Sequence, residues 1–217
     1  MVLDVIQILS IAIVVVALTA SMSIFWMSWR NGISPMPSSR RVRRAVAEEI
    51  NRLGASGRIV EAGSGWGTLA VHLAKHCEGW RVEGVENSPL PLAFSRFAAW
   101  LTFGVRPVAG TAGDAPPSVV FRKDNLYDIS YRDAQAVVFY LYPGAMRRLG
   151  PILREQLAPG ARIVSVCFAL PGWVPERVVV CKDLYKTRVY VYEQPPLEEA
   201  PQAAFEWRMP NAEQLVH

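Results

Sequence analysis

Apolar residues fill one long segment at the N-terminus of the chain. No charged residue occurs from Val5 to Trp26. A helix of about 22 residues extends about 33 Å, which is enough to cross the hydrocarbon core of a bilayer. A cleavable signal peptide fits less well, because no lysine or arginine precedes the segment and its apolar stretch is too long. The pattern therefore predicts a retained, single-pass transmembrane helix over residues 1–30.

Beyond this segment, strand-like and helix-like patterns alternate. Residues 31–39, rich in Gly, Pro and Ser, predict a linker. Apolar positions spaced by three and four residues predict helices at 40–53, 66–77, 90–103 and 146–157. Short apolar runs predict strands at 58–62, 81–86, 119–122, 136–141 and 162–167, and alternating segments at 178–181 and 188–192 suit a hairpin.

This alternation predicts an α/β fold in one domain over residues 40–194. Strands separated by helices are typical of a Rossmann-like sheet, here seven-stranded and mostly parallel, with helices on both faces. The tail, residues 195–217, is rich in Pro, Glu and Ala. Such a composition buries little apolar surface, so we expect the tail to be poorly ordered.

Arginines gather directly after the predicted anchor, and none precedes it. They are Arg30, Arg40, Arg41, Arg43 and Arg44. The positive-inside rule then places the domain in the cytoplasm, attached to the inner (cytoplasmic) membrane. A basic cluster can also bind nucleic acid, but its position beside an anchor favours attraction to anionic lipid headgroups. We therefore expect a membrane location and no nucleic-acid partner.

The strongest chemical signal is the segment Glu61-Ala-Gly63-Ser64-Gly65-Trp66-Gly67, between a predicted strand and a predicted helix. Glycine permits a sharp turn with positive φ and lets a ligand lie against the backbone. The start of the helix offers free N–H groups. A dinucleotide fingerprint would read G-x-G-x-x-G, whereas this spacing is G-x-G-x-G with an acid before it. The pattern suits a ligand without a pyrophosphate, whose cationic end faces Glu61.

Two further candidate contacts follow the next two strands. Glu86, with Asn87, ends the second strand, where a carboxylate can accept hydrogen bonds from both hydroxyls of a ribose. Asp124 and Asn125 follow the third strand and can accept from an adenine amino group, while Leu126 packs on the ring. A turn or a helix cap also explains each one alone. Because they occur in order at the carboxyl ends of successive strands, together they predict a nucleoside-binding crevice.

A metal site is the remaining chemical possibility. His72 and His76 are four residues apart on a predicted helix, a spacing that can bind a metal ion. No third ligand is evident near them, so we predict that the chain binds no metal.

Several longer motifs point to one family. They are Pro35-Met-Pro-Ser-Ser39, Glu86-Asn-Ser-Pro89, Ser95-Arg96, Ala99-Trp100, Phe121-Arg-Lys-Asp-Asn-Leu126, Tyr140-Leu-Tyr-Pro143 with Met146, and Pro171-Gly-Trp173-Val-Pro175. With them, the chain resembles the seven-β-strand (class I) S-adenosylmethionine-dependent methyltransferases over about Ile33 to Pro175. Within that group it is similar to the membrane-anchored lysine methyltransferases of the adenine nucleotide translocase and the ATP synthase c subunit, and to their bacterial relatives.

The resemblance implies S-adenosylmethionine as the cofactor and a pocket for a lysine side chain. Tyr140, Tyr142 and Pro143 stand where family members present the target nitrogen, and Trp173 would close the pocket. Packing alone also explains Tyr140 and Trp173. The family usually has Asp before the glycine loop and another acid inside it, whereas this chain has Glu61 and Trp66.

The resemblance therefore implies a membrane-anchored methyltransferase that modifies a lysine of a membrane protein, near which the anchor would confine it. Two alternatives stay open. One is methylation of a lipid or another hydrophobic small molecule, and the other is a membrane protein that binds S-adenosylmethionine without transferring its methyl group. The identity of the target, the number of methyl groups added and the oligomeric state do not follow from the sequence.

Overall fold

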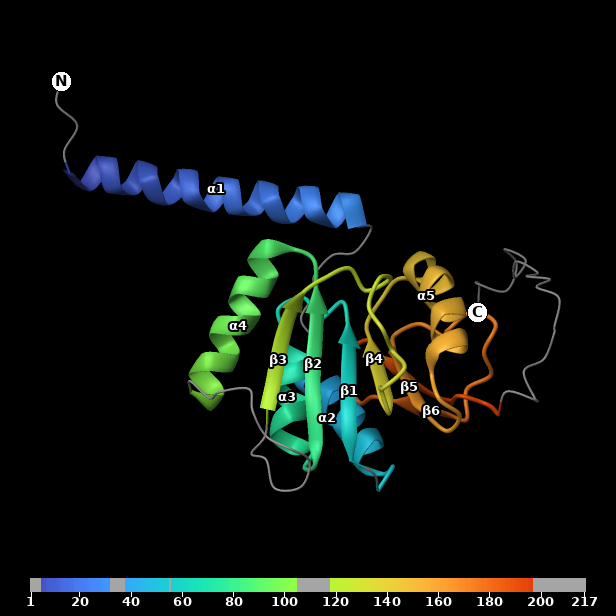
Figure 1. Cartoon of the computed structure of the whole chain (residues 1–217). Helices are drawn as coiled ribbons and strands as arrows, with labels where there is room; N and C mark the ends of the chain where they lie inside the picture. The colour runs from blue at the N-terminus through green and yellow to red at the C-terminus, as the bar shows by residue number, and fades with distance from the viewer. Residues whose placement is uncertain (1–4, 32–37, 55, 105–117, 197–217) are drawn as a thin grey trace.

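Seven strands form one sheet in the order β3-β2-β1-β4-β5-β7-β6 (Figure 1). The structure is a computed structural model that describes residues 5–31, 38–54, 56–104 and 118–196. The strands are β1 (Gly57–Ala62), β2 (Trp80–Glu86), β3 (Ser118–Lys123), β4 (Ala136–Phe139), β5 (Arg162–Val166), β6 (Arg177–Val180) and β7 (Arg188–Glu193). The first five are parallel, and β7 runs antiparallel to both β5 and β6. The predicted mostly parallel sheet with a terminal hairpin is confirmed.

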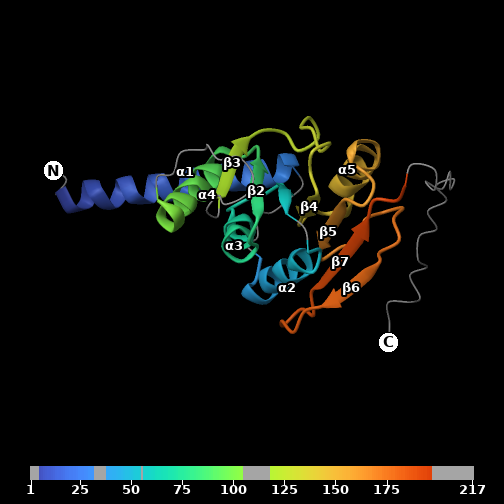
Figure 2. The ribbon, with the colours of Figure 1, turned by 60° about the horizontal axis from the view of Figure 1, so that its bottom comes forward.

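Helices cover both faces of the sheet, as predicted (Figures 1 and 2). The helices α2 (Arg40–Asn51), α3 (Thr68–His76) and α4 (Pro89–Phe103) contribute to the buried cluster on one face. The helix α5 (Pro143–Gln156) contributes to the cluster on the other. Because both faces are covered, the central strand β4 is wholly apolar and buried, as expected for a parallel strand in this position.

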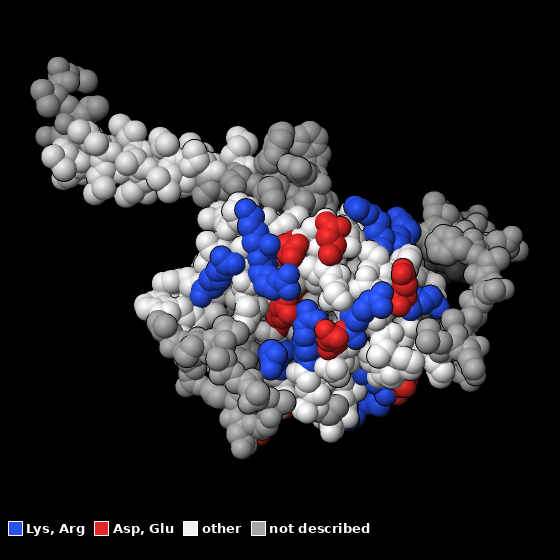
Figure 3. All heavy atoms as spheres, in the orientation of Figure 1, with Lys and Arg blue, Asp and Glu red and all other residues white. Residues whose placement is uncertain are grey.

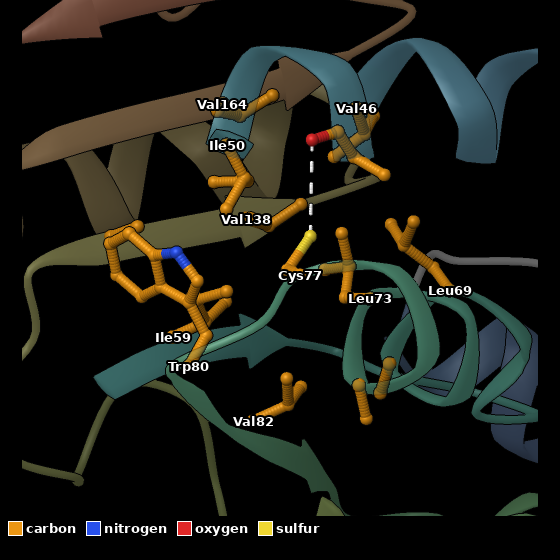
Figure 4. Packing of buried hydrophobic residues seen from close by; sticks show 14 of the residues in the cluster. Val46, Ile50, Ile59, Leu69, Leu73, Cys77, Trp80, Val82, Val138 and Val164 are labelled. Atoms are coloured by element: carbon orange, nitrogen blue, oxygen red, sulfur yellow. Dashed lines mark hydrogen bonds between the residues drawn. The ribbon is translucent and has the colours of Figure 1, made fainter. Parts of the chain in front are cut away.

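The core consists of two apolar layers separated by the sheet. Ile59 and Val138 pack with α2 and α3, while their neighbours Val60 and Val137 pack with α5, because successive side chains of a strand point to opposite faces. Figure 4 shows the first layer, where the Cys77 thiol donates to a backbone carbonyl of α2 at 3.8 Å. These layers hold the strands at a fixed register and thereby align their carboxyl ends.

The order of the strands reverses direction between β1 and β4. From β1 the chain steps outward to β2 and then β3, whereas from β4 it steps the other way to β5. The connections after β1 and β4 therefore leave the sheet in opposite directions. Open α/β sheets bind ligands in the crevice that this reversal creates at the carboxyl ends of the strands.

The N-terminal segment corrects a prediction from the sequence. It forms a helix, α1 (Val5–Asn31), outside the two layers of the domain (Figure 1). A membrane-spanning helix must stay apolar over about 20 residues. Among the described residues, no helix combines the length and apolarity that a membrane crossing requires. The predicted transmembrane helix over residues 1–30 was therefore wrong, and so was the single-pass location in the inner membrane that depended on it.

Two other predicted segments fall partly or wholly outside the described residues. Of the linker over 31–39, residues 32–37 are not described, and of the tail over 195–217, residues 197–217 are not. Among the described residues, α2 begins at Arg40 and β7 ends at Glu193; the domain boundaries at residues 40 and 194 stay a prediction.

Charged side chains link three neighbouring strands on the face opposite α3. Glu83 of β2 accepts from Arg58 of β1 at 2.8 Å and from Arg122 of β3 at 2.9 Å. Arg122 also pairs with Asp124, just beyond β3, at 3.0 Å. Figure 3 shows basic and acidic side chains interleaved on this face. The Glu83 side chain is only 13% exposed, so it holds β1, β2 and β3 together where solvent screens it poorly.

Replacing Glu83 tests this link. Glu83→Ala leaves the largely buried Arg58 guanidinium without its partner, so we expect the free energy of unfolding to fall by about 1–3 kcal/mol. Glu48→Ala is the matched control, because Glu48 pairs with Arg44 on the surface of α2 with both side chains more than half exposed. Such a pair contributes about 0.5 kcal/mol or less. Equal losses for the two variants in urea unfolding would contradict the role of Glu83.

Candidate cofactor site

The loop between β1 and α3 can be built only with glycine at its turning points. Gly63, Gly65 and Gly67 have φ of 74°, 52° and 72°, in the left-handed region that glycine adopts without strain. A Cβ atom on Gly67 would stand 2.6 Å from the side chains of both Phe121 and Ser95. The loop therefore lies tightly against β3 and α4, and α3 begins immediately after it at Thr68.

Glu86 fastens this loop to the end of β2. Its Oε2 accepts from the Gly65 N–H at 2.8 Å, and its Oε1 accepts from the Ser88 N–H at 2.8 Å. The Glu86 side chain is buried, whereas Asn87 beside it is exposed. A carboxylate oxygen can accept more than one hydrogen bond. Both oxygens thus keep the capacity to accept from a pair of hydroxyls.

The residues after β3 lie at the same edge of the sheet, but their side chains bond to one another. Asp124 pairs with Arg122 and also accepts from the Asn125 N–H at 2.9 Å. The Asn125 amide donates to Asp128 at 2.7 Å. Leu126 is the member of the set that reaches the glycine loop, since its side chain lies 3.7 Å from the place of a Cβ on Gly63. The Asp124 N–H donates to the Glu86 carbonyl at 3.3 Å, which joins this turn to β2.

Two polar side chains, one at the end of β1 and one in the loop after it, are buried and each has an atom without a hydrogen-bond partner. Glu61 is 5% exposed and Ser64 is 6% exposed. The Oε2 atom of Glu61 and the Oγ atom of Ser64 accept and donate no hydrogen bond. Burial raises the pKa of Glu61 to about 8, a hydrogen bond from the Ala70 amide lowers it, and the charge of Glu86 raises it. These surroundings therefore favour the neutral form of Glu61.

Trp66, which replaces an acid usual at this position, lies against α4. Its ring meets that of Phe94 edge to face, with the ring centroids 5.3 Å apart. Edge-to-face contacts of this kind are favourable beyond the area they bury. Trp66 therefore joins the glycine loop to the surface of α4.

The four residues predicted for the lysine pocket fall into two places. Tyr140 directly follows β4 and packs with the α3-side layer, and burial raises the pKa of its phenol. Tyr142 and Pro143 begin α5, where Tyr142 is the N-cap residue. Trp173 packs instead with the α5-side layer: its ring contacts the Tyr192 ring, with centroids 6.3 Å apart. The described contacts thus bring Tyr140, Tyr142 and Pro143 to the end of β4 but give Trp173 a packing role.

Tyr127, an aromatic residue near Tyr142, was not among the site residues predicted from the sequence. Burial raises the pKa of the Tyr127 phenol, and the neighbouring Tyr142 raises it further. The Arg148 guanidinium of α5 lies over the Tyr127 ring, 4.0 Å from its centroid. Tyr127 directly follows the Asp124-Asn125-Leu126 motif in the sequence. That adjacency is the signal from which Tyr127 could have been predicted as a site residue.

The two histidines of α3 stack on each other, with ring centroids 4.1 Å apart. Burial, together with the charges of His76, Arg43 and Lys75, lowers the pKa of His72 to about 4. No group of three or more His, Cys, Asp or Glu side chains suited to a metal ion occurs in the part of the chain that the structure describes.

Comparison with known proteins identifies the family. The family described as "ANTKMT methyltransferase domain" matches residues 61–177, more than half of the chain. This chain belongs to that family. The matched range begins at Glu61 and includes the glycine loop, Glu86 and the Tyr140–Pro143 segment.

Curated relatives in this family are named as lysine methyltransferases. The chain is 35% identical over 127 residues to the adenine nucleotide translocase lysine N-methyltransferase of Mus musculus, covering 58% of this chain and 50% of that protein. It is 30% identical over 123 residues to a Xenopus laevis lysine N-methyltransferase named for the ATP synthase c subunit, with coverage of 57% and 49%. A protein-lysine N-methyltransferase of Saccharolobus islandicus is 26% identical over 157 residues, covering 72% and 90%. The chain spans about half the length of the first two relatives.

Solved structures agree on the fold and the cofactor. An RNA methyltransferase from Salinibacter ruber in complex with S-adenosyl-L-homocysteine has a TM-score of 0.62 and 28% identity, covering 79% of this chain and 100% of that one. The magnesium protoporphyrin IX methyltransferase of Synechocystis PCC 6803, with a TM-score of 0.54, 13% identity and coverage of 70% and 78%, shares the fold. The cofactor of this family member is S-adenosylmethionine.

The site fits this cofactor. The backbone of the glycine loop is free of side chains where it turns, Glu86 presents two carboxylate oxygens beside it, and Leu126 offers an apolar surface. The buried Glu61 supplies an acid without a charged partner. When bound, S-adenosylmethionine supplies a methyl group on a cationic sulfonium.

Replacing Glu86 tests the assignment of the site. Glu86→Ala removes the two oxygens predicted to accept from the ribose and the hydrogen bond to the Gly65 amide, so we expect S-adenosylmethionine affinity to fall about 100-fold or more in calorimetry. Glu78→Ala, an exposed acid at the end of α3, is the control and is expected to bind normally. Glu86→Gln, which preserves side-chain volume, separates binding from folding. Unchanged affinity in folded Glu86 variants would refute the site.

Proposed function

We propose that this protein is an S-adenosylmethionine-dependent protein-lysine N-methyltransferase. The observation that carries the proposal is the Glu86 carboxylate bonded to the glycine loop, within a domain whose family includes lysine methyltransferases. The Saccharolobus islandicus relative supports the proposal further, because this chain covers 90% of its length. The alignments with the two longer relatives leave about half of each uncovered.

Methyl transfer to lysine needs a neutral amine held in line with the methyl group. Burial beside aromatic rings lowers the pKa of an amine, and orientation supplies much of the remaining acceleration. Tyr140 and Tyr142 closely follow the end of β4, and the Tyr142 side chain is exposed, which supports a role for them beside the substrate. Because burial raises the pKa of Tyr140, its phenol stays protonated and would orient the amine by hydrogen bonding rather than act as a base.

The surface beside the glycine loop favours a protein substrate over a nucleic acid. The side chains Leu90, Phe94, Phe97 and Leu101 lie on one side of α4 and are all more than a third exposed. The one charged residue of α4, Arg96, donates to the Phe121 carbonyl at 3.1 Å. An RNA substrate needs cations to neutralise its phosphates. This uncharged face therefore suits an apolar protein partner.

Three other functions are outcomes that the experiment must distinguish. The Salinibacter ruber neighbour is described as an RNA methyltransferase, so RNA is one alternative substrate. Methylation of a lipid or hydrophobic small molecule is a second, and binding of the cofactor without transfer is a third. That the target lysine lies on a membrane protein stays a prediction, supported by the substrates named for the curated relatives.

The full chain incubated with methyl-labelled S-adenosylmethionine and extract from its own cells, membranes included, tests the function. We expect label that resists nuclease, migrates with a protein band and is recovered as methyl-lysine after hydrolysis. Glu86→Gln, which weakens cofactor binding at constant side-chain volume, is the control and should leave the band unlabelled.

Each other outcome contradicts the proposal in its own way. Label removed by nuclease would assign RNA as the substrate, and label extracted into organic solvent would assign a lipid or small molecule. Bound cofactor without any transferred label, across extracts from several growth conditions, would indicate a binding protein.

A further inference from the structure

Glu61 is an acid enclosed by the protein beneath the cofactor loop. It stands near the end of β1, and its side chain is 5% exposed. Its Oε2 atom has no hydrogen-bond partner. None of the ion pairs among the described residues includes Glu61. A carboxylate in this position would carry an uncompensated charge in a medium of low dielectric constant, which is strongly unfavourable.

The groups packed around Glu61 do not relieve this cost. From β2, the Glu86 carboxylate contributes a second negative charge, and from α3 the Ala70 amide contributes one hydrogen bond. Ser64 of the loop is neutral, and the Arg96 side chain of α4 is directed to the Phe121 carbonyl. The net effect of burial and these neighbours raises the pKa of Glu61 to about 8. Burial and these neighbours therefore favour the protonated, neutral form of Glu61 in the free protein.

A cation in the crevice would reverse this balance. S-adenosylmethionine carries the positive charge of its sulfonium, and a nearby positive charge favours the ionised form of an acid. S-adenosylhomocysteine, which remains after methyl transfer, has a neutral thioether in the same place. The donor and the product thus differ by one positive charge on sulfur.

We propose that Glu61 makes the loop discriminate between the two forms of the cofactor: it releases its proton when the cationic donor binds and takes a proton back when the neutral product is left. Glu61 is then a specificity-determining residue that favours binding of donor and departure of product. This inference rests on the proposed function, because it takes S-adenosylmethionine as the ligand of the loop.

The dependence on pH follows from the direction of the proton movement. Donor binding releases a proton, so donor affinity rises with pH up to the pKa of Glu61 in the free protein and levels off above it. Product binding leaves Glu61 protonated and lacks this dependence. The ratio of donor affinity to product affinity should therefore rise from pH 6 to pH 8 and flatten by pH 9.

Calorimetric titration of the full chain with each of the two ligands tests the proposal. Titrations at pH 7 in phosphate and in Tris, which differ in ionisation enthalpy, count the protons released. Glu61→Gln keeps the shape of the side chain and cannot ionise, so it is the matched control, and it also subtracts protons exchanged by the amino groups of the ligands. Thermal unfolding of the variant establishes that it is folded.

We expect wild type to release about one proton more than Glu61→Gln on binding the donor, and markedly fewer on binding the product. The donor-to-product affinity ratio of wild type should rise at least tenfold between pH 6 and pH 9, and that of Glu61→Gln should stay flat. Equal proton release by wild type and variant, or parallel pH profiles, would overturn the role of Glu61. Failure of the donor to bind at all would instead refute the cofactor assignment on which the proposed function depends.

Discussion

The Glu86 carboxylate is the interaction on which the arrangement of the site depends. It holds the Gly65 amide with one oxygen and the Ser88 amide with the other, both at 2.8 Å. The loop after β1 and the loop after β2 are thereby fixed to each other at the carboxyl edge of the sheet. The Asp124 amide bonds to the Glu86 carbonyl, so the turn after β3 is fixed to the same residue. Three strand ends thus form one rigid rim before any ligand arrives.

This rim has an electrostatic consequence. Closing the loop over the end of β1 buries Glu61 close to Glu86, and the pKa of Glu61 rises because burial penalises its charge and Glu86 repels it. In the free protein, these surroundings favour the neutral form of Glu61. An arrangement of this kind responds to the charge of its ligand. In a methyltransferase, the charge of the cofactor is the property that changes during the reaction.

The sequence predicted the strands, their order along the chain and the edge that carries the site, because apolar periodicity and glycine placement are local signals. Glu86 was assigned to the rim for the same reason: it ends a strand. The surroundings of the Glu61 and Trp173 side chains were harder to predict from the sequence, because segments distant along the chain form them. Glu61 is surrounded by groups that include the Ala70 amide of α3 and Glu86 of β2, and Trp173 packs on Tyr192 of β7, 19 positions further along the chain. The transmembrane prediction failed because no helix among the described residues is long and apolar enough to cross a membrane.

The most direct test of the account is a crystal structure of the protein with S-adenosylhomocysteine bound. The account predicts that both ribose hydroxyls donate to the Glu86 carboxylate, that the adenine lies beside Leu126, and that the backbone of the glycine loop borders the amino-acid end. A ligand bound elsewhere, or a ribose without contact to Glu86, would contradict the central claim.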